Sequence, residues 1–99
     1  MKLTMLNATN QVIPVYLGDH LMNIALRLFK GVLFATIEVD GEVVVASRRV
    51  VFGENIFGYK CNETRYGLLR LMRKYDSDVA DTKAYNEAIY LDFESPVES

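Results

Sequence analysis

The sequence predicts a mainly β protein: a small antiparallel β-barrel or sandwich around a central three-stranded meander, with or without one short helix. Two glycine turns, Lys30-Gly31 and Asp40-Gly41, separate three apolar segments that together run from Ile24 to Arg48. Such turns suit two-residue hairpin loops, because glycine adopts the positive φ that these loops require. Further short apolar segments occur at hairpin spacing along the chain, which is typical of small barrels and sandwiches.

The two turns also predict which residues of the meander lie opposite one another, because a hairpin loop of fixed length sets the register of its strands. The sets expected side by side on one face are Ile24, Ile37 and Val44, then Leu26, Ala35 and Ala46, then Leu28 and Leu33 next to Arg48. This face is almost wholly apolar, so we expect it to line the core.

The opposite face of the meander is also more hydrophobic than a face that meets only water. It is expected to carry Arg27, Phe29, Phe34, Thr36, Glu38, Val43 and Val45. Either a second sheet of the same chain or another molecule should therefore cover it. The register places Arg27 across from Phe34, where the guanidinium can rest on the ring.

Aromatic residues and arginines together on an incompletely covered face are typical of binding hot spots. We therefore predict an interaction surface on this face and at the end of the meander. Its candidate residues are Arg27, Phe29, Phe34, Val43, Val45, Arg48 and Arg49.

The rest of the chain adds short strands around the meander. Extended segments are expected at 3–6, 12–17, 56–60 and 88–93. The second of them contains Pro14, which lacks a backbone donor and favours an edge position. We expect one domain over residues 1–94 and a flexible acidic tail over 95–99.

The segment 65–75 fits two structures. Helical spacing is followed by Leu68, Leu71, Met72 and Tyr75, whereas Leu69, Leu71 and Tyr75 fit a strand less cleanly, because Arg73 interrupts the alternation. The periodicity alone favours a helix. Its basic and aromatic residues could contact a nucleic-acid backbone, although the solvated side of an amphipathic element is the simpler interpretation.

Signals for catalysis are poor. The chain has 99 residues, a net charge of -2, one histidine (His20, expected in a turn) and one cysteine (Cys61). One histidine cannot form a multi-imidazole metal site, and nothing places His20 beside Cys61 as a general base. We therefore expect no enzyme activity, no cofactor and no metal. The charge argues against a general nucleic-acid binder, and we expect neither a secretory signal nor a membrane span.

Several segments together resemble a known family. They are Asn10-Gln11 followed by Ile13 and Leu17, Ile24-x-Leu26-Arg27-x-Phe29-x-Gly31, Ile37-x-Val39-Asp40-Gly41-Glu42-x-Val44, the arginines at 48 and 49, and the closing segment Tyr85–Phe93. This pattern is similar to that of the small baseplate plug proteins of contractile-tailed bacteriophages. The resemblance is good over about residues 10–60 and loose elsewhere, and it moves the expectation for 65–75 towards a strand.

The resemblance implies a structural virion protein that is made in the host cytoplasm and located in the tail baseplate. Such a protein would block the tail tube lumen near the hub and spike, alongside the tape-measure protein. Copies would associate in a three- or six-fold ring set by the symmetry of the tube. Two alternatives remain open: a small nucleic-acid-binding barrel, and a phage-encoded inhibitor of a host protein.

Overall fold

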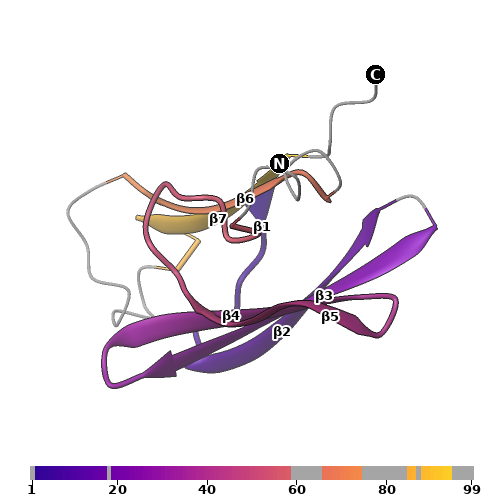
Figure 1. The fold of residues 1–99 in the computed structure, drawn as a ribbon. Helices are drawn as coiled ribbons and strands as arrows, with labels where there is room; N and C mark the ends of the chain where they lie inside the picture. The colour runs from indigo at the N-terminus through magenta and orange to yellow at the C-terminus, as the bar shows by residue number, and fades with distance from the viewer. Residues whose placement is uncertain (1, 18, 59–65, 75–84, 87, 95–99) are drawn as a thin grey trace.

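We describe the protein from a computed structural model that covers residues 2–17, 19–58, 66–74, 85–86 and 88–94 (Figure 1). Its elements are β1 (Lys2–Leu3), β2 (Asn10–Leu17), β3 (His20–Phe29), β4 (Val32–Val39), β5 (Glu42–Arg49), β6 (Leu68–Arg73) and β7 (Ile89–Glu94). None of these elements is a helix, so the mainly β prediction is confirmed. The predicted tail, 95–99, lies outside the described residues.

The strands form two antiparallel sheets that lie as two layers (Figure 1). The larger sheet has the order β2-β3-β4-β5, and the smaller has the order β1-β7-β6. Buried apolar side chains from both sheets form one core between the layers. Ile24 and Ile37 contribute from the larger sheet, and Leu69 and Leu91 from the smaller, all with no exposed surface.

The β3–β4 hairpin has the register that its turn predicts. Leu26 lies opposite Ala35, and Ile24 lies opposite Ile37. Its turn residues Lys30 and Gly31 both have positive φ, of 49° and 77°. The next turn repeats this geometry, with φ of 53° at Asp40 and 84° at Gly41.

The predicted register of β5 is wrong, because β5 contains two irregularities that add residues to it. Ile37 lies opposite Val45 rather than Val44, and Ala35 lies opposite Arg48 rather than Ala46. Three successive valines, 43–45, lack the strict alternation that would fix a single face. The β-bulges let both Val44 and Val45 pack against the core.

The flanking strands were predicted in part. β2 is an edge strand of the larger sheet, in agreement with Pro14. β6 shows that the helical interpretation is wrong for residues 68–73: Leu69 and Leu71 are fully buried, and their neighbours alternate with them. Pairing with β7 favours the strand, because it satisfies the backbone of both segments. Of the strand expected at 56–60, residues 56–58 form a turn, where Gly58 has a φ of 86°, and residues 59 and 60 lie outside the described residues.

Gln11 connects the start of β2 to the chain segment that crosses between the sheets. Its side chain is buried, and its Oε1 accepts a hydrogen bond from the Leu6 amide at 2.7 Å. Its Nε2 donates to the carbonyls of Leu6 and Ala8 at 2.9 and 3.3 Å. The amide of Gln11 thus holds the segment that brings the chain from the smaller sheet to the larger one.

Candidate interaction surface on the four-stranded sheet

The larger sheet has an outer face, the side that points away from the smaller sheet. Cross-strand partners divide this face into five rows that run across the strands. In order along β3, the rows are Phe29 and Val32; Asn10, Arg27, Phe34 and Arg49; Val12, Ala25, Thr36 and Ser47; Pro14, Asn23, Glu38 and Val43; and Tyr16 and Leu21. The register of each pair of neighbouring strands determines this arrangement.

Large apolar side chains are exposed on the outer face. Val12 is 59% exposed, Tyr16 76%, Phe29 49% and Val43 49%. These are four of the six large apolar side chains of the described residues that are strongly exposed. They therefore lie together on one side of one sheet, whereas single exposed apolar residues scattered over a surface are ordinary.

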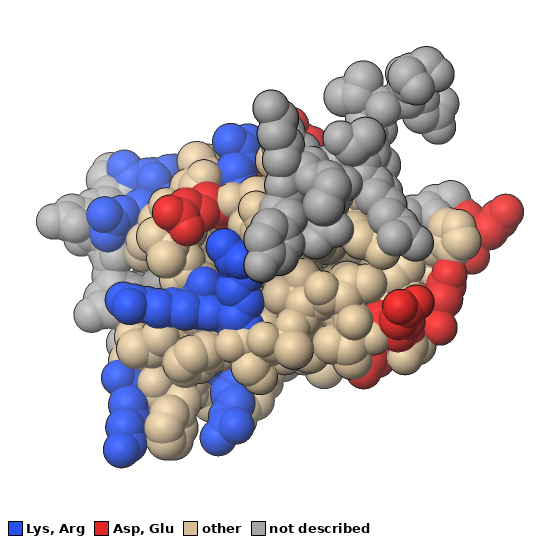
Figure 2. Space-filling model, in the orientation of Figure 1, with Lys and Arg blue, Asp and Glu red and all other residues tan. Residues whose placement is uncertain are grey.

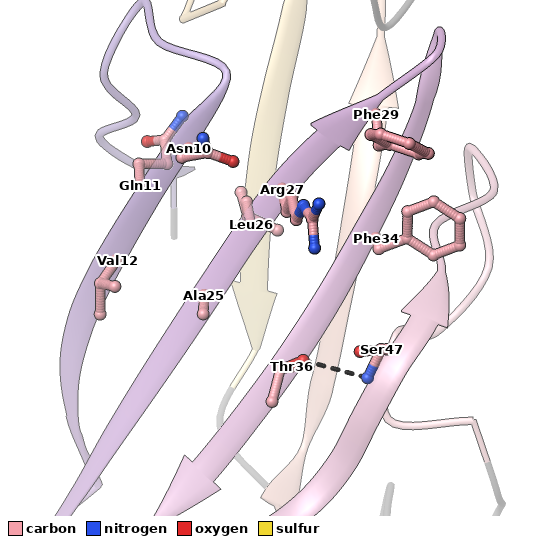
Figure 3. A pocket seen from close by; sticks show the side chains of 10 residues that line it. All are labelled: Asn10, Gln11, Val12, Ala25, Leu26, Arg27, Phe29, Phe34, Thr36 and Ser47. Carbon is pink, nitrogen blue, oxygen red and sulfur yellow. Dashed lines mark hydrogen bonds between the residues drawn. The ribbon is translucent and has the colours of Figure 1, made fainter.

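The middle of the outer face is hollow. A hollow of about 560 Å³ extends over Ala25, Arg27, Phe34 and Thr36, between Asn10 on β2 and Ser47 on β5 (Figure 3). A second one, of about 300 Å³, begins at the same middle row and reaches Asn23 and Glu38. The small side chains of the middle row leave this space open, because the larger ones stand in the rows on either side.

Charge is distributed unevenly along the sheet. Figure 2 shows most Lys and Arg on the left side of the molecule and most Asp and Glu at the right end, with one acidic group among the basic side chains at the upper left. On the outer face, Arg27 and Arg49 share one row and Glu38 belongs to the row beyond the middle. The face is therefore basic towards the β3–β4 turn and acidic towards the β4–β5 turn.

Arg27 lies opposite Phe34, as predicted, but its guanidinium rests on a different ring. Its Cζ is 5.2 Å from the ring centroid of Phe29, and the Nζ of Lys30 is 5.4 Å from the same centroid. Phe29 points in the same direction as Arg27 because the two are separated by two positions on one strand. The prediction of contact with the Phe34 ring is therefore replaced by contact with Phe29.

The structure brings together on the outer face Arg27, Phe29, Phe34, Val43 and Arg49. It excludes Val45, which is only 7% exposed and belongs to the core, because the bulges in β5 turn it inward. Arg48 is also displaced: its guanidinium lies against Gly58, so that a Cβ at this glycine would clash with it. Sequence reasoning missed Val12 and Tyr16, although their alternation with the buried Ile13 and Val15 is a signal for the exposed side of β2.

His20 begins β3 and does not lie in the turn predicted for it. Its Nδ1 contacts a carboxylate oxygen of Asp40, and the Leu21 amide donates to the other oxygen at 3.0 Å. These hydrogen bonds, with that of His20 as the larger cause, lower the pKa of Asp40 below its ordinary value of 3.8. The pair is exposed and connects two turns.

Other chemical sites find no support in the part of the chain that the structure describes. It contains no group of three or more His, Cys, Asp or Glu side chains that could hold a metal ion. It also contains no helix of the length and apolar character needed to cross a bilayer. Cys61 lies outside the described residues.

Comparison of the chain with protein-family models and with curated proteins found no match. Function is therefore inferred from the chain's own surface and sequence pattern.

Proposed function

We propose that this chain is a structural protein of a contractile phage tail that plugs the tail tube lumen at the baseplate hub. The observation that carries the proposal is the outer face of the larger sheet. It exposes Val12, Tyr16, Phe29 and Val43, although the other face of the same sheet already packs in one core with side chains of β6 and β7. A protein that functions inside an assembly can keep such a face, because its neighbours cover it.

The sequence pattern supports the same class of function. The Leu26-Arg27-x-Phe29 strand and the Asp40-Gly41 turn are the segments that resemble baseplate plug proteins, and both contribute to the outer face or to its end. The partners would be tail tube, hub, spike and tape-measure proteins, with copies of the chain arranged in a three- or six-fold ring. The protein would be made in the host cytoplasm and then remain in the virion.

The contacts of two arginines in β6 argue against nucleic acid as the partner. Arg70 lies in the middle of β6, and its Nη2 is 3.5 Å from Oδ2 of Asp92 and 3.6 Å from Oε1 of Glu94. The Arg73 guanidinium stacks on Phe52, with 4.6 Å between Cζ and the ring centroid. These two basic side chains of the 65–75 segment are thus engaged within the chain, which leaves them poorly placed to bind phosphates.

The proposal is tested by mass spectrometry of tails purified from the virions of the phage that encodes this chain. We expect the protein in intact tails at a fixed ratio to the hub protein. Isolated tail tubes without baseplates, prepared in parallel, serve as the control and should lack it. Absence of the protein from intact tails, or its recovery only in the lysate of infected cells, would contradict the proposal.

A further inference from the structure

We propose that, in the free protein, the outer face is covered by a second copy of the same chain in a two-fold, face-to-face pair. The strands of the two facing sheets run antiparallel. This pair is a state of the free protein and does not depend on a location in the tail.

The rows of the outer face are arranged symmetrically about the middle row, which contains Val12, Ala25 and Thr36. Consider a two-fold axis that runs across the strands at this row. It places the first row of one copy over the fifth row of the other copy, and the second row over the fourth. Chemical complementarity between these exchanged rows is therefore the condition for such a pair.

The rows next to the middle are complementary in charge. One contains Arg27 and Arg49, and the other contains Glu38. The two-fold operation places the arginine row of each copy over the glutamate row of the other copy. This favourable contact therefore occurs once on each side of the axis. The alternative axis, parallel to the strands, would place the arginine row over the arginine row and the glutamate row over the glutamate row, and like charges at short distance oppose association.

The outermost rows are complementary in another way, because both are apolar. Phe29 and Val32 at one end would meet Tyr16 and Leu21 at the other. Phe29 and Tyr16 are among the most exposed apolar side chains of the described residues. Their burial in the pair would remove from water the surface that the monomer leaves uncovered.

The hollows of the outer face lie next to the two-fold axis. The larger hollow lies between the middle row and the arginine row, and the smaller one lies between the middle row and the glutamate row. The two-fold operation therefore places the larger hollow of one copy over the smaller hollow of the other. The small Ala25 and Thr36 at the axis permit the two sheets to approach to the usual spacing of about 10 Å.

The size of the face indicates a weak pair. Between Leu21 and Phe29 the strand spans about 26 Å, and four strands measure about 19 Å across, given their usual rise and separation. This gives roughly 500 Å² for each copy and roughly 1,000 Å² for both, near the lower limit for specific interfaces. We therefore expect association to become visible in the micromolar range rather than the nanomolar range.

Sedimentation velocity of the purified full chain, from about 1 to about 500 μM, is the test of the pair. The wild type should shift from monomer to dimer over this range. Arg27→Glu and Glu38→Arg should each remain monomeric, because the first brings a new carboxylate over Glu38 of the facing row and the second brings a new guanidinium over the row of Arg27 and Arg49. The matched controls Lys74→Glu and Glu54→Arg make the same kind of change at exposed positions outside the outer face, and they should dimerise like the wild type.

The decisive step is to mix the two monomeric variants. In a mixed pair, the carboxylate introduced by Arg27→Glu would face the guanidinium introduced by Glu38→Arg. The native Glu38 of the first variant would likewise face the native Arg27 of the second. The dissociation constant of the heterodimer in the mixture should therefore be at least tenfold lower than that of either variant's own dimer. Formation of the heterodimer also shows that both variants are folded.

A wild-type chain that stays monomeric at about 500 μM would overturn the pair, as would a mixture that stays monomeric. Both outcomes leave the tail proposal intact, because that proposal is tested by the composition of the tail. Conversely, a heterodimer from a protein that is absent from tails would support the pair and contradict the tail proposal.

Discussion

The side chain of Asn86 and the backbone of Met5 form two hydrogen bonds with each other, across 81 positions of the sequence. Asn86 Oδ1 accepts from the Met5 amide at 2.8 Å, and Asn86 Nδ2 donates to the Met5 carbonyl at 2.6 Å. Asn86 has a φ of 72°, a conformation that asparagine tolerates better than most residues. The contact holds the segment after β1 against the segment that leads into β7.

Replacing Asn86 should therefore lower stability in a defined order. Asn86→Gly removes both hydrogen bonds but keeps the positive φ, and it should lower the free energy of unfolding by about 1–2 kcal/mol. Asn86→Ala removes the same bonds and adds backbone strain, so it should lower the free energy further. Thermal unfolding followed by circular dichroism measures both, with an expected decrease in Tm of about 5–15 °C for the glycine variant. An unchanged Tm for Asn86→Gly would show that the contact does not stabilise the fold.

Ile37 tests the core side of the larger sheet. It has no exposed surface, and it lies between Ile24 and Val45. Ile37→Asp should prevent folding, because it buries a carboxylate among aliphatic side chains with no partner. Ile37→Val is the matched control and should fold with a loss of about 1 kcal/mol. One-dimensional proton NMR distinguishes the two outcomes, and dispersed methyl signals from the aspartate variant would contradict the described core.

Gly41 tests the β4–β5 turn. Its φ is 84°, and a Cβ built there would meet no atom within 4 Å, so the cost of a side chain is conformational rather than steric. Gly41→Val should lower the free energy of unfolding by about 1–2 kcal/mol, because a β-branched residue resists positive φ. Gly41→Asn should lose much less. Urea denaturation compares them, and equal midpoints for the two variants would exclude this explanation.

The lowered pKa of Asp40 predicts that the stability of the fold depends on pH. Hydrogen bonds from His20 and from the Leu21 amide lower the pKa of its carboxyl in the folded protein. A group whose pKa is lowered by folding stabilises the fold above its unfolded pKa, and this contribution disappears as the pH falls through the folded pKa. The wild type should therefore melt above Asp40→Asn at about pH 6, and the difference should vanish as the pH falls from about 4 to about 2. A difference in Tm that grows on acidification would contradict this assignment.

Phe34 distinguishes folding from association. It is half-buried and lies beside the larger hollow of the outer face. Phe34→Ser should fold, with a loss of about 1 kcal/mol, but it should be poorly incorporated into tails, because it removes an aromatic anchor from the binding face. The control is Phe52→Ser, which changes a half-buried phenylalanine away from this face and should be incorporated normally if it folds. Normal virions from a phage carrying Phe34→Ser would exclude the outer face as the binding surface.

The parts of the fold that sequence predicted depend on local chemistry. The β3–β4 register follows from Lys30-Gly31, since a two-residue turn with positive φ leaves one pairing for the flanking strands. The edge position of β2 follows from Pro14, which has no amide to donate. Because the β3–β4 register was correct, Arg27, Phe29 and Phe34 were placed on the correct face.

The parts that sequence could not predict depend on contacts between distant segments. The valines at 43–45 permit several registers, and only packing against the core selects the one with Val45 inside. The final position of Arg48 depends on the loop that brings Gly58 to it. β6 satisfies both helical and strand spacing, and pairing with β7 makes the choice.

Cryo-electron microscopy of the intact baseplate tests most directly whether the outer face is a binding surface. We expect density for this chain on the tube axis, with Val12, Phe29 and Phe34 in contact with a neighbouring protein or another copy. Density that shows the chain there with these side chains facing solvent, or a baseplate that lacks the chain altogether, would contradict it.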